Sequence, residues 1–197
     1  MAPRMLLARA CVTVALATQV ICYCGGATTA TTTTTPPPCP SSPGGQLSPH
    51  TTAQEIVDKL GLAPNVEGGY YVETFRDERL LPGSNRSVST AIYYLLEGPD
   101  VPALWHRVTD AAEVWHWYAG APLVLDLSSD DGTPTRSHVL GQDIFSDQMP
   151  QIVIPANEWQ RATSLGNWTL VGTTVAPAFV PEGYEVAPDG WEPNDGA

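Results

Sequence analysis

Residues 105–120, WHRVTDAAEVWHWYAG, contain the spacing that decides the fold. His106 stands seven residues before Glu113, and Gly120 stands seven residues after it. Alternate residues of a strand face the same side, so two strands joined by a short loop would bring His106 and Glu113 to one inward face. Gly120 would end the second strand in a turn. This arrangement is typical of a metal-binding β-barrel, although Val108 occupies the position expected for a second histidine.

Short segments rich in β-branched and aromatic residues surround this stretch and predict strands, with Pro-Gly, Gly-Pro, Asp-Gly and Gly-Asn breaks between them. Before them, Thr52 and Glu55 have capping-box spacing, and Gly61 would end a short helix. One helix followed by about eight strands predicts an all-β, antiparallel fold that is closed or built of two sheets. The expected strands cover residues 66–76, 89–98, 103–108, 113–120, 123–129, 151–155 and 168–177, and a further strand contains Gln160.

The N-terminal part of the chain predicts secretion. Residues 1–27 combine Arg4 and Arg9 with an apolar run and contain no acidic residue, which is typical of a signal peptide. A membrane anchor is the alternative, but polar residues interrupt the run. Residues 28–51 are rich in threonine and proline and predict a disordered stalk. In a secretory pathway the sequons at Asn85 and Asn167 are usable for N-glycosylation.

Charge and cysteine content narrow the function further. All 21 acidic residues follow residue 54, and the formal net charge is −12, which argues against nucleic acid or an anionic membrane as a partner. The four cysteines all precede residue 40. The expected domain, residues 52–187, therefore has no disulfide and no thiolate for catalysis or zinc. Residues 188–197 are acidic and rich in proline and glycine, and we expect a flexible tail.

The segments between residues 56 and 187 resemble the cupin superfamily. More closely, they resemble the cupin family formerly designated domain of unknown function 985, in whose order they occur. The segments are LGL, EGGYYVETFR, TAIYYLLE, WHRV with EVWHWYAG, LGQDI, QIVIPANEWQRA and WTLVGTTVAPAF. The resemblance implies a jelly-roll barrel with a ligand cavity inside. It also implies a homodimer, which is common in related cupins.

In the cupin superfamily, the spacing of His106, Glu113 and Gly120 belongs to a metal-binding signature. The second half of the general cupin signature, P-x-G-x-x-H, begins at Pro155, but Asn157 replaces its glycine and Gln160 its histidine. The implied metal ligands would be His106, Glu113 and Gln160, and an amide oxygen is a poor ligand for transition metals. We therefore expect no cofactor, with a divalent metal at these three residues as the weaker alternative.

The candidate catalytic residues are His106, Glu113 and a tyrosine. A buried carboxylate beside an imidazole can form a general acid–base pair. Equally open is the interpretation that His106 and Glu113 only satisfy each other's hydrogen bonds inside the barrel. A tyrosine that faces the barrel could form with His106 the His/Tyr acid–base couple seen in cupin sugar epimerases, and we assign Tyr93 as the acid. Ordinary packing of strand aromatics is the plainer interpretation. Strand alternation alone does not choose among Tyr70, Tyr71, Tyr93 and Tyr94.

The candidate ligand-binding residues are aromatic, charged or amide-bearing. Trp115 and Trp117 share the inward parity of Glu113 and could stack on a sugar, or only pack the core. Glu67 precedes two glycines that permit a positive φ, and Arg76 could anchor a carboxylate or phosphate. A tight turn and an exposed strand arginine are the plainer interpretations. The whole set is Glu67, Tyr71, Arg76, Trp115, Trp117 and Gln160.

Together these features favour a secreted cupin-fold protein that binds a small polar or sugar-like ligand in its barrel. One hypothesis is a metal-independent isomerase or epimerase with His106 as the base. A non-catalytic small-molecule-binding module is the second, and a metal-dependent cupin oxygenase or lyase is the third. Val72 stands where the related family usually has arginine, which argues against a ligand held through an anionic group.

Overall fold

The computed structural model describes residues 50–196. The expected signal peptide, all but the end of the expected stalk, and the four cysteines lie outside these residues. Within residues 50–196 no helix is both long and apolar enough to cross a membrane.

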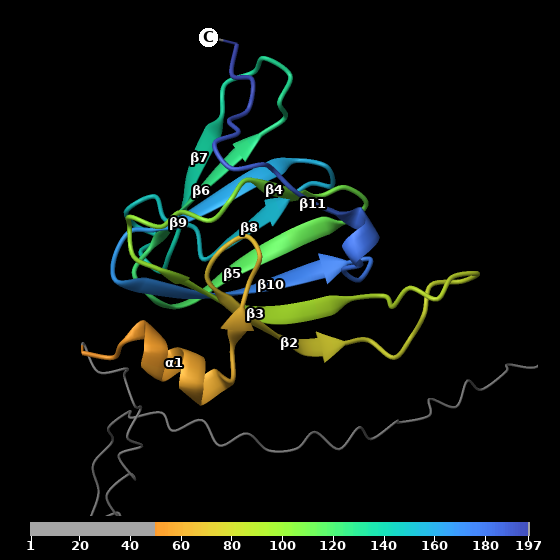
Figure 1. The fold of residues 1–197 in the computed structure, drawn as a ribbon, viewed down its shortest axis with the longest axis horizontal. Coiled ribbons are helices and arrows are strands. Elements are labelled where there is room, and N and C mark those ends of the chain that lie inside the picture. Colours follow the sequence, from red (N-terminus) through yellow and green to blue (C-terminus); the bar gives the residue numbers. More distant parts are fainter. Residues whose placement is uncertain (1–49, 197) are drawn as a thin grey trace, which may run out of the picture. The chain divides into compact units, whose positions relative to one another are not determined.

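Two antiparallel sheets form a jelly-roll barrel, which confirms the all-β cupin fold with a short N-terminal helix (Figure 1). The six-stranded sheet has the order β1 (Ala63–Pro64), β2 (Tyr70–Arg76), β3 (Thr90–Glu97), β10 (Trp168–Ala176), β5 (Ala112–Gly120) and β8 (Gln151–Ile154). The five-stranded sheet has the order β11 (Tyr184–Val186), β4 (His106–Val108), β9 (Trp159–Ser164), β6 (Leu123–Ser128) and β7 (Arg136–Leu140). A short 3-10 helix, Pro181–Gly183, leads into β11.

Helix α1 (Ala53–Leu60) begins and ends at the residues that the capping pattern predicts. Thr52 and Glu55 form both hydrogen bonds of a capping box, and Gly61 ends the helix with a φ of 66°. The apolar face of α1 packs on Leu95 and its neighbours, on the outer side of the six-stranded sheet. The helix therefore covers the outside of the barrel and leaves the interior to side chains from the two sheets (Figure 1).

Apolar side chains from both sheets fill the middle of the barrel. They alternate with outward-facing residues along each strand, as one buried sheet face requires. The core contains Leu96 and Trp115 from the six-stranded sheet and Leu125 and Ala162 from the five-stranded sheet, all nearly or completely buried. β5 ends at Gly120, whose φ of 89° forms the expected turn.

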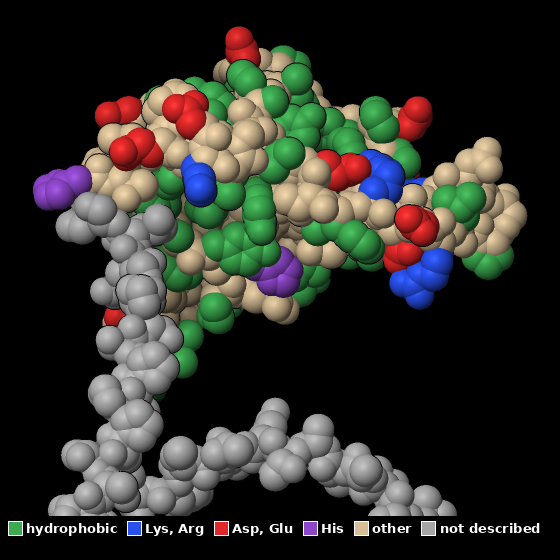
Figure 2. Space-filling view, turned by 90° about the horizontal axis from the view of Figure 1, so that it is seen from below, with side chains coloured by type: hydrophobic (Ala, Val, Ile, Leu, Met, Phe, Trp, Pro, Cys, Tyr) green, Lys and Arg blue, Asp and Glu red, His purple; other side chains and the backbone are tan. Residues whose placement is uncertain are grey.

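The outer face of the six-stranded sheet beyond α1 is also partly apolar. Figure 2 shows hydrophobic side chains over much of the side on which α1 lies. Tyr118 and Val153 are exposed there, and the His116 ring stacks on Tyr118 at a centroid distance of 6.4 Å. Such a patch suits an interface between copies, but the homodimer implied by the resemblance stays a prediction.

Three strands, β1, β7 and β11, were absent from the expected set, and β1 has only two residues. β7 escapes the sequence pattern because it begins with Arg136, Ser137 and His138, which are polar, and it lies at a sheet edge where one side needs no partner. β11 has three residues and is defined by its pairing with β4, which brings Tyr184 beside Val108.

The C-terminal segment, whose flexibility stays a prediction, makes side-chain contacts with the five-stranded sheet. Trp191 packs against Trp159 at a ring-centroid distance of 4.5 Å. Glu192 accepts a hydrogen bond of 2.7 Å from Arg161. Trp191 therefore packs the described part of this segment, residues 188–196, against the five-stranded sheet.

Candidate functional site

A cavity of about 430 Å³ opens between the two sheets. Its volume lies in the range of small-molecule sites. Both sheets, the loop before β2 and the segment before β11 contribute to its walls. The polar lining residues other than Tyr71 and Tyr94 are Asn65, Glu67, Glu73, Arg76, Thr90, His106, Glu113, Thr173 and Tyr184. The aromatic lining residues are Tyr71, Tyr94, Trp115, Phe179 and Tyr184.

His106 lines this cavity from the first position of β4 and is 3% exposed. Its Nδ1 lies 3.0 Å from the carbonyl oxygen of Leu104 and 3.3 Å from Oε2 of Glu67. A carbonyl oxygen can only accept, so Nδ1 carries a proton in this arrangement. In the neutral ring Nε2 then holds a free lone pair, which is the form required of a general base.

The loop before β2 fixes the position of Glu67. The backbone of Asn65 and Gly69 closes the loop with a hydrogen bond of 2.9 Å. Gly68 and Gly69 adopt positive φ values of 109° and 67°, and the hydroxyl of Tyr94 donates to the carbonyl oxygen of Gly68 at 2.9 Å. This turn is the conformation that the double glycine permits, and it holds Glu67 at the cavity wall with only 6% exposure.

Tyr184 completes a chain of contacts behind His106. Its hydroxyl donates to Oε2 of Glu67, the same oxygen that lies near Nδ1 of His106. Burial and the negative charge of Glu67 raise the pKa of Tyr184 far above its usual value, so the phenol remains a donor. No sequence pattern pointed to Tyr184, because only the pairing of β11 with β4 brings it to the site.

Glu113 faces the cavity from β5 and is 8% exposed. Gln160, which pairs with His106 across β4 and β9, donates its amide Nε2 to Oε2 of Glu113 at 2.6 Å. Burial raises the pKa of Glu113, and the charge of His106 and hydrogen bonds from Gln160 and Thr173 oppose that rise. Glu113 is thus a carboxyl group that holds a proton more readily than an exposed one.

This raised pKa predicts how stability depends on pH. The folded protein retains the Glu113 proton above 4.5, the ordinary value, while the unfolded chain releases it. Glu113 therefore removes stability as the pH rises above 4.5. We expect the stability of Glu113→Gln relative to the unsubstituted protein to increase as the pH rises above 4.5. Urea unfolding at several pH values measures this difference. A stability difference that does not change with pH would contradict the prediction.

Comparison with known proteins places the chain in a family. The model of the Cupin superfamily (DUF985) matches residues 54–187. The chain belongs to this cupin family. A crystal structure of a Shewanella oneidensis protein is 27% identical, with a TM-score of 0.64, over 70% of this chain and 85% of that one. A hypothetical protein from Leishmania major is 26% identical, with a TM-score of 0.62, over 70% and 88% of the two chains. No curated protein matches significantly.

The cavity of this cupin brings together most of the residues singled out from the sequence. Each lies on the inward side of its strand or on the loop that enters β2. The candidates that line the cavity are Glu67, Tyr71, Arg76, His106, Glu113 and Trp115. The catalytic and binding roles assigned to them stay predictions.

Tyr93 does not line the cavity, which corrects its assignment as the candidate acid. It packs beneath α1 on the outer side of the six-stranded sheet, and its ring lies 5.9 Å from that of Tyr118. Tyr94 faces the cavity instead. Inward and outward residues alternate along β3, and the pairing of Tyr71 with Tyr94 fixes which of the two tyrosines faces inward.

Trp117 and Gln160 also lie away from the cavity wall. Trp117 packs against the barrel core, and its Nε1 donates to the carbonyl oxygen of Ala121 at 3.1 Å. Gln160 is completely buried and reaches the site only through Glu113. Direct contact with a ligand is therefore not expected of either residue, and Gln160 is better described as a positioning residue.

The residues of this cupin do not fit the metal that the family signature implies. Val108 offers no donor, and Gln160 presents its N–H group, not its oxygen, to Glu113. His106 and Glu113 would then supply two protein donors, fewer than the three that catalytic metal sites commonly use. Within residues 50–196 no three His, Cys, Asp or Glu side chains are grouped as a metal site.

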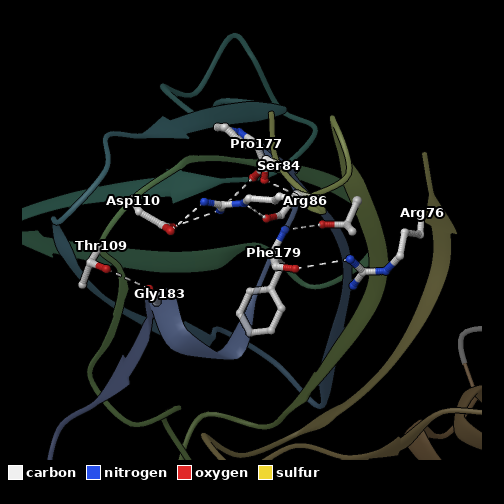
Figure 3. Close-up of polar contacts among 10 residues, drawn as sticks. Arg76, Ser84, Arg86, Thr109, Asp110, Pro177, Phe179 and Gly183 are labelled. Carbon is white, nitrogen blue, oxygen red and sulfur yellow. Dashed lines mark hydrogen bonds and ion pairs between the residues drawn. The ribbon is translucent and has the colours of Figure 1, made fainter. Parts of the chain in front are cut away.

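Two arginines, of which only Arg76 lines the cavity, donate to backbone carbonyl oxygens of the segment before β11 (Figure 3). Arg86 forms two hydrogen bonds with Asp110, at 2.6 and 3.0 Å, and a third with the carbonyl oxygen of Ala178 at 2.7 Å. Arg76 pairs with Glu73 at 2.6 Å and also contacts the carbonyl oxygen of Phe179. Both arginines therefore anchor the segment before β11, which contributes Phe179 to the cavity.

Proposed function

We propose that this cupin is a secreted protein that binds a small, polar, sugar-like molecule and moves a proton on it without a metal. The reaction would be an isomerisation or epimerisation beside a carbonyl group. The arrangement of Leu104, Glu67 and His106 supports the proposal most, because it keeps the proton on Nδ1 and leaves Nε2 as the basic nitrogen.

Each proton in the proposed reaction has a donor and an acceptor. Nε2 of His106 takes the proton from the carbon beside the carbonyl, and the electrons of that C–H bond form the carbon–carbon double bond of an enediol. The hydroxyl of Tyr94, which lines the cavity, gives its proton to the carbonyl oxygen. In the second half, His106 returns its proton to carbon, and Tyr94 recovers one from a hydroxyl group.

The buried groups around His106 support this chemistry electrostatically. The imidazolium formed in the first step lies 3.3 Å from the carboxylate of Glu67. A carboxylate at that distance stabilises the charged ring. Tyr184 donates to the same carboxylate and keeps it in position. Tyr184 is accordingly a positioning residue, because it acts through Glu67.

Deuterium exchange tests the proposal without knowledge of the final product. The purified protein would be incubated in deuterium oxide with aldoses, ketoses and amino sugars of hexose size, and proton NMR would follow the carbon beside the carbonyl. We expect protein-dependent loss of that proton signal for at least one compound. A compound that binds in saturation-transfer NMR but shows no exchange would favour the non-catalytic binding module.

Secretion rests on the sequence alone. Asn85 and Asn167 are both exposed, which is compatible with glycans on the folded protein. We expect N-glycosidase to increase the electrophoretic mobility of the protein secreted by eukaryotic cells. Unchanged mobility would contradict glycosylation at these two positions.

A further inference from the structure

Two carboxylates face the cavity from different elements and receive almost no positive charge. Glu67 and Glu113 are 6% and 8% exposed. Among the described residues, their partners are the hydroxyl groups of Tyr94, Thr173 and Tyr184, the Gln160 amide and the His106 ring. Of these groups only the imidazole can become positive. The side chains that line the cavity therefore include more acidic than basic groups.

The arginines do not neutralise this cavity. Each of the six arginines in residues 50–196 forms an ion pair with a carboxylate other than Glu67 or Glu113. Arg76 is the one described arginine that lines the cavity, and Glu73 pairs with it at the rim. The rim pair is neutral as a unit, so it leaves the inner carboxylates without a cation.

The tyrosines of the cavity experience the same negative charge. Burial raises the pKa of both Tyr94 and Tyr184, and the charges of Glu67 and Glu113 raise each of them further. Their hydroxyl groups stay protonated and donate, but they supply no positive charge. Burying a carboxylate without a counter-charge is costly, so a positively charged ligand would offset the cost of burying Glu67 and Glu113.

The aromatic walls suit the same kind of ligand. Phe179 and Tyr184 meet edge to face at a centroid distance of 5.3 Å, and Tyr71 lies beside the same cavity. An ammonium group is attracted to the face of an aromatic ring, and more strongly when it is removed from water. Carboxylates and aromatic rings around one space therefore favour an organic cation.

We propose that the cavity selects a small molecule with a protonated amine, of which an amino sugar is the representative class, over neutral and anionic molecules of the same size. The ammonium group would lie between Glu67 and Glu113. This inference rests on the proposed function for the sugar-like part of the ligand and adds the charge that the ligand carries.

A size-matched series of hexoses tests the charge preference on the full secreted protein. Glucosamine, glucose and glucuronate would be titrated at the same pH and ionic strength and followed by calorimetry or saturation-transfer NMR. Hydrogen bonds to charged groups predict that glucosamine binds about ten- to hundredfold more tightly than glucose. Glucuronate is expected to bind more weakly than either. Equal affinity for glucosamine and glucose, preferred binding of glucuronate, or no binding of glucosamine at millimolar concentration would overturn the proposal.

Substitutions locate the source of the preference. Glu113→Gln and Glu67→Gln each remove one cavity charge and should reduce the glucosamine-to-glucose ratio about tenfold. Glu192→Gln is the matched control, because Glu192 is exposed and lies outside the cavity, so the ratio should not change. A ratio that falls equally in all three variants would show an effect of overall charge and overturn the assignment to the cavity.

The two proposals fail in different ways. If glucose or glucuronate exchanges its proton and binds as well as glucosamine, the charge preference is wrong and the proton-transfer function stands. If glucosamine binds preferentially without exchange, the charge preference stands and the proton-transfer function is wrong.

Discussion

Replacement of His106 by asparagine is expected to lower the rate of deuterium exchange about 10²- to 10⁴-fold, the usual contribution of a general base. Asparagine places an amide N–H group where Nδ1 donates to Leu104 and Glu67, so it preserves those contacts. It has no atom at the position of Nε2. The variant therefore removes the base with little disturbance of the groups that surround it.

His116→Asn is the control for this substitution. His116 lies on the outer side of the six-stranded sheet and stacks on Tyr118, so the same change there should leave exchange unaffected. Binding of the ligand to the His106 variant, measured by calorimetry, separates loss of the base from loss of the site. Full exchange activity in a folded His106→Asn protein would contradict the proposed role.

Gly69→Ala is expected to lower the free energy of unfolding by about 2–4 kcal/mol. Gly69 has a φ of 67°, and a Cβ atom at this position would collide with the carbonyl oxygen of Leu95. It would also press on Tyr94 at 3.1 Å. The backbone oxygen belongs to β3 and cannot rotate away, so the loop that carries Glu67 must shift. Urea unfolding measures the loss of stability.

Gly83→Ala provides the matched comparison. Gly83 has a similar φ of 74°, but no atom lies within 4 Å of the position of its Cβ. Its substitution should cost about 1–2 kcal/mol, the penalty of the left-handed conformation alone. An equal loss in the two variants would show that the close approach of Gly69 to β3 contributes nothing.

Much of the fold could be predicted from local patterns in the sequence. The capping box of α1 and the turn at Gly120 depend on residues that are near one another in the chain. β7 could not be recognised, since its first three residues are polar. The packing of Trp191 on Trp159 could not be predicted from the composition of the C-terminal segment, because the two residues are far apart in the chain.

In the candidate site, too, local patterns could be predicted and tertiary pairings could not. Two local signals in the sequence pointed to the site: the spacing of His106 and Glu113, and the double glycine after Glu67. The side chains of Glu67, His106 and Glu113 all line the cavity. The choice between Tyr93 and Tyr94 depends on the register of β3 with its neighbours, which one sequence does not contain. Tyr184 reaches Glu67 from 117 residues away in the chain. Its position follows from the tertiary pairing of β11 alone.

The most direct test of the central claim is the tautomer of His106, read from the ¹⁵N chemical shifts of its ring by NMR. The spectra would be recorded at a pH where the ring is neutral, with His106→Asn used to assign the signals. The hydrogen bond to Leu104 predicts a protonated Nδ1 and an unprotonated Nε2. A proton on Nε2 with a bare Nδ1 would contradict the account, because His106 would then have no base directed at a ligand.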